Sequence, residues 1–200
     1  MRVVLDAVGH AFDGRPTLFT ALSATLAPAH VYALVGPSGS GKSTLLSLLA
    51  GWLEPTDGEV RRDGVERIGW VFQNPHGVAR RTAVDHVALP LLARGAHRAR
   101  AHADARRLLE RFGLGDAADR PFAQLSGGEA QRLMLARGLA SAPDLFLVDE
   151  PTAQLDRAAA HDVTQSLAAL AGSGAIVVVA THDTAVRDAC TDVIDLAEHR

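Results

Sequence analysis

The sequence predicts an α/β fold built around a mainly parallel β-sheet. Three apolar runs of strand length carry this prediction, at residues 31–35, 145–148 and 175–180. Because these runs have no polar interruption, they are typical of strands buried on both faces, as the central strands of a parallel sheet are. With 200 residues, of which 48% are hydrophobic, the chain is expected to form one domain around a well-filled core.

Two further stretches are predicted to form an antiparallel β layer at the edge of this core. Residues 2–29 and 58–72 alternate weakly between apolar and polar positions. Turn signals interrupt them at Asp13-Gly14 and at Asp63-Gly64, as expected between antiparallel strands.

Residues 83–142 have helical rather than strand character. We expect a helical subdomain over approximately residues 75–142, inserted in a single domain that spans residues 1–200. An apolar stripe at helical spacing runs through this stretch and consists of Ala101, Ala105, Leu108, Leu109 and Phe112.

Charge does not indicate a nucleic-acid or anionic-membrane partner. The chain has 20 basic and 23 acidic residues, for a formal net charge of -3. The arginines around the apolar stripe have no interleaved aromatic residues, so they are interpreted as a solvated helix face, with a partner-docking surface as the alternative. We therefore expect no nucleic acid among the partners. These arginines are Arg94, Arg98, Arg100, Arg106, Arg107 and Arg111.

The composition predicts a soluble protein in a reducing, cytoplasmic compartment. Cys190 is the only cysteine, which allows no intramolecular disulfide and fits a residue that packs against a helix. The N-terminus lacks the unbroken apolar stretch of a signal peptide. The longest apolar run, residues 175–180, is far shorter than the ~18 residues that a membrane-spanning helix needs.

A phosphate-binding loop is predicted at residues 36–43. Their sequence fits the pattern G-x-x-x-x-G-K-[ST], and it lies directly after a predicted strand and before a helical pattern. Glycines let consecutive backbone N–H groups converge on an anion, and a helix N-terminus adds partial positive charge. We expect Lys42 to bind the β- and γ-phosphates and the Ser43 hydroxyl to bind Mg²⁺, which indicates MgATP as the ligand.

Two adjacent carboxylates, Asp149 and Glu150, follow the apolar run at residues 145–148. They lie at the C-terminal end of a predicted strand, which is the edge where open α/β sheets bind ligands. Because successive strand residues point to opposite sides, we expect different roles for the two groups. Asp149 would reach the hydrated Mg²⁺ beside Ser43, and Glu150 would polarise the water that attacks the γ-phosphate.

The phosphate-binding loop and the carboxylates also fit a small-molecule kinase or a GTPase, but a third motif at residues 125–129 does not. Locally, Ser126 and Glu129 form an S-x-x-E capping box that begins a helix. Paired glycines in a first helical turn cost stability, so Gly127 and Gly128 indicate that something approaches the backbone closely. We interpret this helix N-terminus as a second phosphate-binding surface, for which a kinase offers no reason.

With these motifs in this order, the sequence resembles the ABC ATPase family over essentially its whole length, and residues 125–129 match the signature motif of that family. The resemblance implies a P-loop NTPase (RecA-like) α/β core with a mainly parallel sheet, an antiparallel β edge layer and a helical subdomain. It also implies that Phe12 is the adenine-stacking aromatic, Gln73 the glutamine after a strand at residues 68–72, Asp156 part of the D-loop and His182 the switch histidine.

The motifs and the resemblance together predict three sets of site residues. The catalytic residues are Glu150, Gln73, His182 and Asp156, and the Mg²⁺ ligands are Ser43, Gln73 and Asp149. The nucleotide-binding residues are Phe12, Gly36, Pro37, Ser38, Gly39, Ser40, Gly41, Lys42, Ser43, Thr44, Ser126, Gly127, Gly128 and Glu129.

The resemblance implies an ATP-hydrolysing subunit that works as a dimer. In that family the signature motif of one subunit closes over the ATP bound to the other, so we expect a homodimer. The implied partners are integral-membrane permease subunits encoded separately, which would hold the chain on the inner face of the cell membrane. Residues 82–92 resemble the matching stretch of ATP-binding subunits for lipoprotein release and macrolide export, which favours export or extraction from the membrane.

Three alternatives stay open at this point. The chain could be a non-transport ABC ATPase of DNA repair or translation, it could drive an importer, or it could pair with a different ATPase chain.

Overall fold

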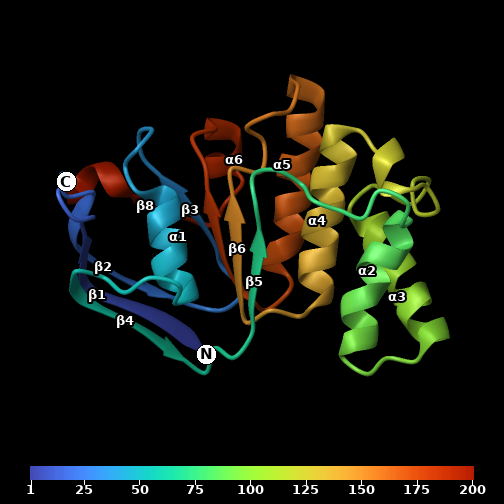
Figure 1. The fold of residues 1–200 in the computed structure, drawn as a ribbon, viewed down its shortest axis with the longest axis horizontal. Coiled ribbons are helices and arrows are strands. Elements are labelled where there is room, and N and C mark those ends of the chain that lie inside the picture. Colours follow the sequence, from blue (N-terminus) through green and yellow to red (C-terminus); the bar gives the residue numbers. More distant parts are fainter.

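Two β-sheets and a group of helices make up the fold (Figure 1). The computed structural model describes the backbone of residues 1–200 and the side chains except those at positions 168, 169 and 171. Figure 1 shows the antiparallel sheet at the left, the parallel sheet in the middle, and α2 and α3 at the far right. Among the described residues, no helix combines the length and the apolar character needed to cross a membrane.

The central sheet has the strand order β5-β6-β7-β3-β8, and every neighbouring pair is parallel. Successive residues of β6 face opposite cores: Leu145 and Leu147 belong to one hydrophobic cluster, Phe146 and Val148 to the other. The predicted parallel sheet with strands buried on both faces is thereby confirmed. The strands are β3 (Val31–Val35), β5 (Ile68–Val71), β6 (Leu145–Asp149), β7 (Ile176–Ala180) and β8 (Asp192–Asp195).

The prediction that residues 58–72 all belong to the antiparallel layer is wrong for β5. This strand pairs in parallel with β6, from Ile68 opposite Leu145 onward. Two hydrogen bonds hold the starts of β5 and β6 side by side. The Arg67 amide donates to the Asp144 carboxylate at 2.8 Å, and the Asp144 amide donates to the Arg67 carbonyl at 2.8 Å.

The antiparallel sheet has the order β2-β1-β4 and covers one side of α1 (Lys42–Ala50). Helix α1 lies between the two sheets, because its leucines share one cluster with Leu5 of the antiparallel sheet and Leu34 of the parallel sheet. The Arg62 side chain of β4 donates to the Leu48 and Leu49 carbonyls at the C-terminal end of α1. The strands are β1 (Arg2–His10), β2 (Phe19–Leu26) and β4 (Asp57–Asp63).

The remaining helices cover the other face of the parallel sheet and extend away from it. The apolar stripe predicted for α3 is confirmed, because Ala101, Ala105, Leu109 and Phe112 are buried. Helix α4 contacts α2 and α3 on one side and β5 and α5 on the other, so it joins the outer helices to the sheet. The helices are α2 (Ala83–Ala93), α3 (Arg98–Arg111), α4 (Gly127–Ala140), α5 (Arg157–Ala171) and α6 (Thr184–Asp188), with 3-10 turns η1 (Phe122–Gln124) and η2 (Leu196–His199).

Candidate active site

A cleft of about 840 Å³ lies at the C-terminal edge of the parallel sheet. It brings together residues from five separate parts of the sequence that the motifs singled out: Phe12, the loop before α1, Gln73, the end of β6 at Glu150, and the end of β7 at His182. Residues without a sequence-based prediction also line it. The lining residues are Phe12, Arg15, Leu18, Ser38, Gly39, Gly41, Lys42, Ser43, Thr44, Gln73, Glu150, Ala153 and His182.

The loop before α1 has the geometry of an anion cradle. Gly41 has a φ of 97°, and a Cβ at this position would lie 3.0 Å from the ring of Phe19. Only glycine therefore fits both the backbone conformation and the space. Gly41 is also the N-cap of α1, and no side chain caps that helix end. The first N–H groups of α1 are thus open to phosphate oxygens at the positive end of the helix dipole.

Lys42 holds its ammonium inside this loop. Its Nζ donates to the Gly36 carbonyl at 3.0 Å and lies 3.7 Å from Oε1 of Glu150, and only 10% of the side chain is exposed. Because the ammonium is partly desolvated, its attraction to an anion in the cleft is stronger than at an exposed site. Lys42 is the only lysine of the chain.

Asp149 has the features of a carboxylate that can bind a cation. Burial raises the pKa of this carboxyl above its usual value; a hydrogen bond from Ser43 opposes the shift, and the neighbouring charge of Glu150 adds to it. Its Oδ1 is buried without a hydrogen-bond partner among the described residues. A buried, unpartnered carboxylate oxygen beside a serine hydroxyl fits Mg²⁺, which prefers oxygen ligands.

Glu150 and His182 form a pair at the ends of two adjacent strands. Oε2 of Glu150 lies 2.8 Å from Nδ1 of His182, and the Glu150 side chain is 15% exposed. Glu150 follows β6 and has a φ of 44°, while its amide donates to the Ala180 carbonyl of β7. The direction of the Glu150 side chain therefore comes from a left-handed backbone conformation after β6. The sequence analysis had instead expected it from the alternation of side chains along the strand. A largely shielded carboxylate held by a histidine is suited to accept a proton from water.

The residues of the signature motif lie outside this cleft and build the start of α4. The predicted capping box is confirmed: the Glu129 amide donates to the Ser126 hydroxyl, and the Glu129 carboxylate accepts from the Ser126 amide. Burial alone would raise the pKa of the Glu129 carboxyl, but the Ser126 amide and the Arg120 guanidinium outweigh it and lower the pKa. Glu129 and Arg120 form an ion pair, so the helix start is held firmly.

Gly127 and Gly128 of this motif have different surroundings. A Cβ at Gly128 would lie 2.7 Å from the Cβ of Ala159, so close packing of α4 on α5 within the chain requires glycine there. At Gly128, the group that approaches the backbone closely is Ala159 of the same chain. A Cβ at Gly127 would make only an ordinary contact at 3.4 Å with Leu155, and Gly127 is exposed.

Several predicted site residues do not line the cleft, among them Asp156, Ser40 and Pro37. Asp156 is the N-cap of α5, and its Oδ1 accepts from the Ala159 amide at 2.9 Å. The Ser40 hydroxyl is buried under the loop without a hydrogen-bond partner among the described residues. Pro37 does not line the cleft, and its carbonyl lies 3.5 Å from Nζ of Lys42.

Arg15 and Leu18 at the mouth of the cleft escaped the sequence analysis. Both belong to the loop between β1 and β2 that carries Phe12, and the Arg15 amide donates to the Phe12 carbonyl in a turn. The nearby turn signal at Asp13-Gly14 indicated this loop, but only the folded chain shows that it lies over the helix start.

Comparison with known proteins gives consistent results. The profile of the family described as "ABC transporter" matches residues 19–153 of the chain. The chain is 37% identical to the lipoprotein-releasing system ATP-binding protein LolD 1 of Caulobacter vibrioides over 213 residues, which covers 98% of this chain and 91% of that protein. It is 39% identical to LolD of Bordetella pertussis over 197 residues, which covers 89% and 85% respectively.

Solved structures share the fold. The ATP-binding cassette MJ0796, a dimer in a post-hydrolysis state bound to ADP and Pi, is 31% identical with a TM-score of 0.78, covering 96% of this chain and 93% of that chain. The cbiO1 protein of Clostridium perfringens, part of the ABC transporter complex cbiONQ, has a TM-score of 0.84 over 96% of this chain and 83% of that chain. At 23% identity, the second similarity concerns the fold alone.

Proposed function

Because this chain belongs to the ABC transporter family, we propose that it hydrolyses MgATP in the cleft described above and passes the resulting motion to separate membrane permeases. It is an ATP hydrolase of that family and an ATP-driven transporter subunit. The main support for the site assignment is that Lys42 and His182 both contact the Glu150 carboxylate within one cleft. The relatives named above include no ATPase of DNA repair or translation, so that alternative gains no support.

The hydrolysis step follows from these positions. The α1 N-terminus and Lys42 hold the phosphates, and Glu150 accepts a proton from water as its oxygen attacks the γ-phosphorus. The bond from the γ-phosphorus to the β–γ bridging oxygen breaks, which leaves ADP and phosphate. Ser43, Asp149 and Gln73 would hold Mg²⁺, which would supply positive charge to the phosphates. His182 keeps the Glu150 carboxylate in place through the 2.8 Å contact.

The position of the signature motif supports a homodimer. Gly127 is exposed at the N-terminal end of α4 and does not line the cleft of its own chain. In the proposed dimer, this helix end of one chain covers the γ-phosphate held by Lys42 of its partner. The similar MJ0796 structure is a dimer with ADP and Pi. A heterodimer with another ATPase chain is the alternative that isolation of the complex would reveal.

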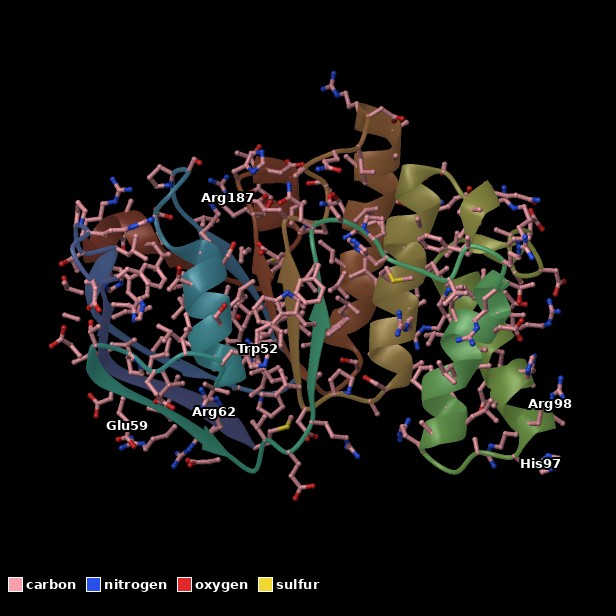
Figure 2. All side chains as sticks on the ribbon, in the orientation of Figure 1. Trp52, Glu59, Arg62, His97, Arg98 and Arg187 are labelled. Atoms are coloured by element: carbon pink, nitrogen blue, oxygen red, sulfur yellow. The ribbon has the colours of Figure 1, made fainter. Side chains whose placement is uncertain are left out.

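A groove between β5 and α2 is the proposed contact with the permease. It measures about 460 Å³ and has exposed apolar side chains at Phe72 and Leu89. Trp52 extends this surface: it is 60% exposed and stacks on Trp70 at 4.4 Å between ring centroids. Figure 2 shows Trp52 between the lower end of α1 and β5. An exposed apolar surface of this kind marks a site for protein partners.

The type of transport is proposed from the relatives. Both LolD proteins named above belong, by their names, to lipoprotein-releasing systems. We therefore propose export or membrane extraction, with the chain in the cytoplasm and bound to the inner face of the membrane through its permeases. An importer is the alternative.

Phosphate release from ATP and Mg²⁺ without any acceptor tests the hydrolysis. Lys42→Ala should weaken ATP binding by about 1.5 to 3 kcal/mol, because a charge-assisted contact to phosphate is lost. Arg98→Ala is the control, since Arg98 lies at the far end of the outer helices in Figure 2. An unchanged ATP affinity in Lys42→Ala would contradict the site assignment.

Co-purification from membranes tests the permease contact. Leu89→Glu should abolish recovery of a permease, whereas Val193→Glu, on the exposed edge strand β8, should not. Equal recovery with both variants would place the contact elsewhere. Sequencing the recovered permease decides between export and import.

A further inference from the structure

A buried histidine lies directly against the aromatic ring at the mouth of the cleft. His10, the last residue of β1, is only 6% exposed. Its ring centroid is 4.8 Å from that of Phe12, and the two planes meet at 86°. This edge-to-face arrangement is a preferred geometry for aromatic pairs, so His10 restricts the orientation of the Phe12 ring.

The imidazole of His10 makes no hydrogen bond to any part of the chain that the structure describes. Neither Nδ1 nor Nε2 has a hydrogen-bond partner among the described residues. Burying a polar group without a partner costs stability, and a leucine would fill a similar volume without that cost. The perpendicular contact with Phe12 is what a histidine provides here and a leucine does not, because an aromatic edge is attracted to an aromatic face.

The backbone of His10 also links the Phe12 loop to the phosphate-binding loop. The His10 carbonyl accepts from the Leu18 amide at 3.0 Å, which closes the loop at residues 11–18. His10 is paired with Phe19 across β1 and β2. The Phe19 ring in turn lies against Gly41, where a Cβ would be 3.0 Å away. His10 therefore lies where the Phe12 loop and the phosphate-binding loop are joined.

We infer that His10 is a positioning residue for base recognition: it holds the Phe12 ring, which is 41% exposed, in the orientation that stacks on the adenine of ATP. The inference rests on the proposed function, because it assumes that the cleft binds ATP with its base against Phe12. His10 does not contact the phosphates in this arrangement. Its effect should therefore fall on the base and leave phosphate binding unchanged.

Two ligands separate these contributions: MgATP, and magnesium with inorganic tripolyphosphate, which has no base. Binding is followed through the backbone amide of Lys42, which gives a single NMR signal after ¹⁵N-lysine labelling because the chain has one lysine. His10→Leu should weaken ATP binding by roughly three- to ten-fold, as expected for loss of one aromatic pair. Tripolyphosphate binding should stay at the wild-type level, and the KM for ATP should rise with kcat retained.

Coupling to Phe12 distinguishes positioning from a general structural effect. In the Phe12→Leu background, His10→Leu should have no further effect on ATP affinity, since the ring that it orients is gone. His10→Gln, which also removes the aromatic edge, should behave like His10→Leu and guards against a folding defect in one variant. Thermal unfolding of each variant confirms that it is folded.

The outcomes that overturn the inference differ from those that overturn the proposed function. Equal weakening of ATP and tripolyphosphate binding, or unchanged ATP binding in both folded His10 variants, would overturn the inference alone. A wild-type chain that binds tripolyphosphate and ATP equally would show that the base is not recognised, and would also overturn the inference. A wild-type chain that binds neither ligand would overturn the proposed function and the inference with it.

Discussion

Nδ1 of His182 lies 2.8 Å from Oε2 of Glu150, and this contact ties together the C-terminal ends of β6 and β7. The other carboxylate oxygen, Oε1, is 3.7 Å from Nζ of Lys42. Glu150 is thus held between the group that would bind the γ-phosphate and a histidine at the surface of the cleft. Its carboxylate can move toward a bound nucleotide only if one of these contacts gives way.

Glu150→Gln should retain ATP binding and lose turnover by about 10²- to 10⁴-fold, because glutamine cannot accept the proton of the attacking water. Phosphate release measures the loss, and size-exclusion chromatography with ATP should show an accumulated dimer. His182→Gln is the matched variant, which keeps Glu150 but removes its histidine contact. A Glu150→Gln protein with wild-type turnover would exclude Glu150 as the base.

Asp149→Asn should raise stability without nucleotide at pH 7 while abolishing Mg²⁺-dependent hydrolysis. Burial raises the pKa of Asp149, so the ionised form is disfavoured in the folded state and lowers stability above that raised pKa. Asparagine removes this penalty. The extra stability of Asp149→Asn over the wild type should diminish as the pH falls through the raised pKa of Asp149, because the folded wild-type carboxyl then becomes neutral. Thermal unfolding at several pH values measures it.

Asp144→Asn, at the other end of β6, is the control, because its stability should change in the opposite direction. Burial would raise the pKa of Asp144, but the Arg67 and Glu66 amides and the Arg67 charge lower it below its usual 3.8. Its ionised form therefore stabilises the fold above about pH 4, and this contribution is lost as the pH falls through the lowered pKa. Asp144→Asn should lower stability at pH 7. The same sign of change in both variants would contradict the assigned environments.

Substitutions at the two signature glycines should separate folding from function. Gly128→Ala should destabilise the chain by about 1 to 3 kcal/mol, because the new Cβ would lie 2.7 Å from Ala159. Gly127→Ala should leave stability unchanged or slightly raised, since alanine favours the helix and meets only an ordinary contact. Its ATPase activity should nevertheless fall if this helix end covers the nucleotide of a partner chain. Chemical unfolding and phosphate release measure the two effects.

His86 should make the stability of the chain depend on pH in the acid range, because it holds residues 78–82 against α2. Its Nδ1 contacts the Thr82 carbonyl at 2.7 Å, and its Nε2 accepts from the Val78 amide at 3.0 Å, so the ring is neutral with the proton on Nδ1. Burial lowers the pKa of His86 below its usual 6.5. The unfolded chain therefore takes up a proton first, and stability should fall as the pH drops below about 6.5.

His86→Asn provides the comparison for this acid effect. Asparagine does not titrate, so the loss of stability between pH 7 and pH 5 should be smaller in the variant than in the wild type. Equal slopes of unfolding free energy against pH would show that His86 does not carry the effect.

The local motifs were predictable because each is contiguous in the chain. The loop at residues 36–43 and the capping box at Ser126 depend on backbone geometry within a few residues, which local residue types largely determine. The buried runs likewise indicated a parallel sheet, since burial on both faces needs an uninterrupted apolar sequence. The nucleotide-binding roles of these residues remain predictions that the experiments above address.

The sequence by itself predicted the buried strands at residues 31–35, 145–148 and 175–180, the helical character of residues 83–142, and the glycine-rich loop before α1. Only the tertiary structure decided that β5 joins the parallel sheet, that Ala159 requires glycine at position 128, and that His10 lies against Phe12. It also decided that Glu150 meets His182, because the order of the strands sets which distant strand ends become neighbours. Local preference acts over one or two turns of chain, whereas these contacts depend on packing between segments far apart in sequence.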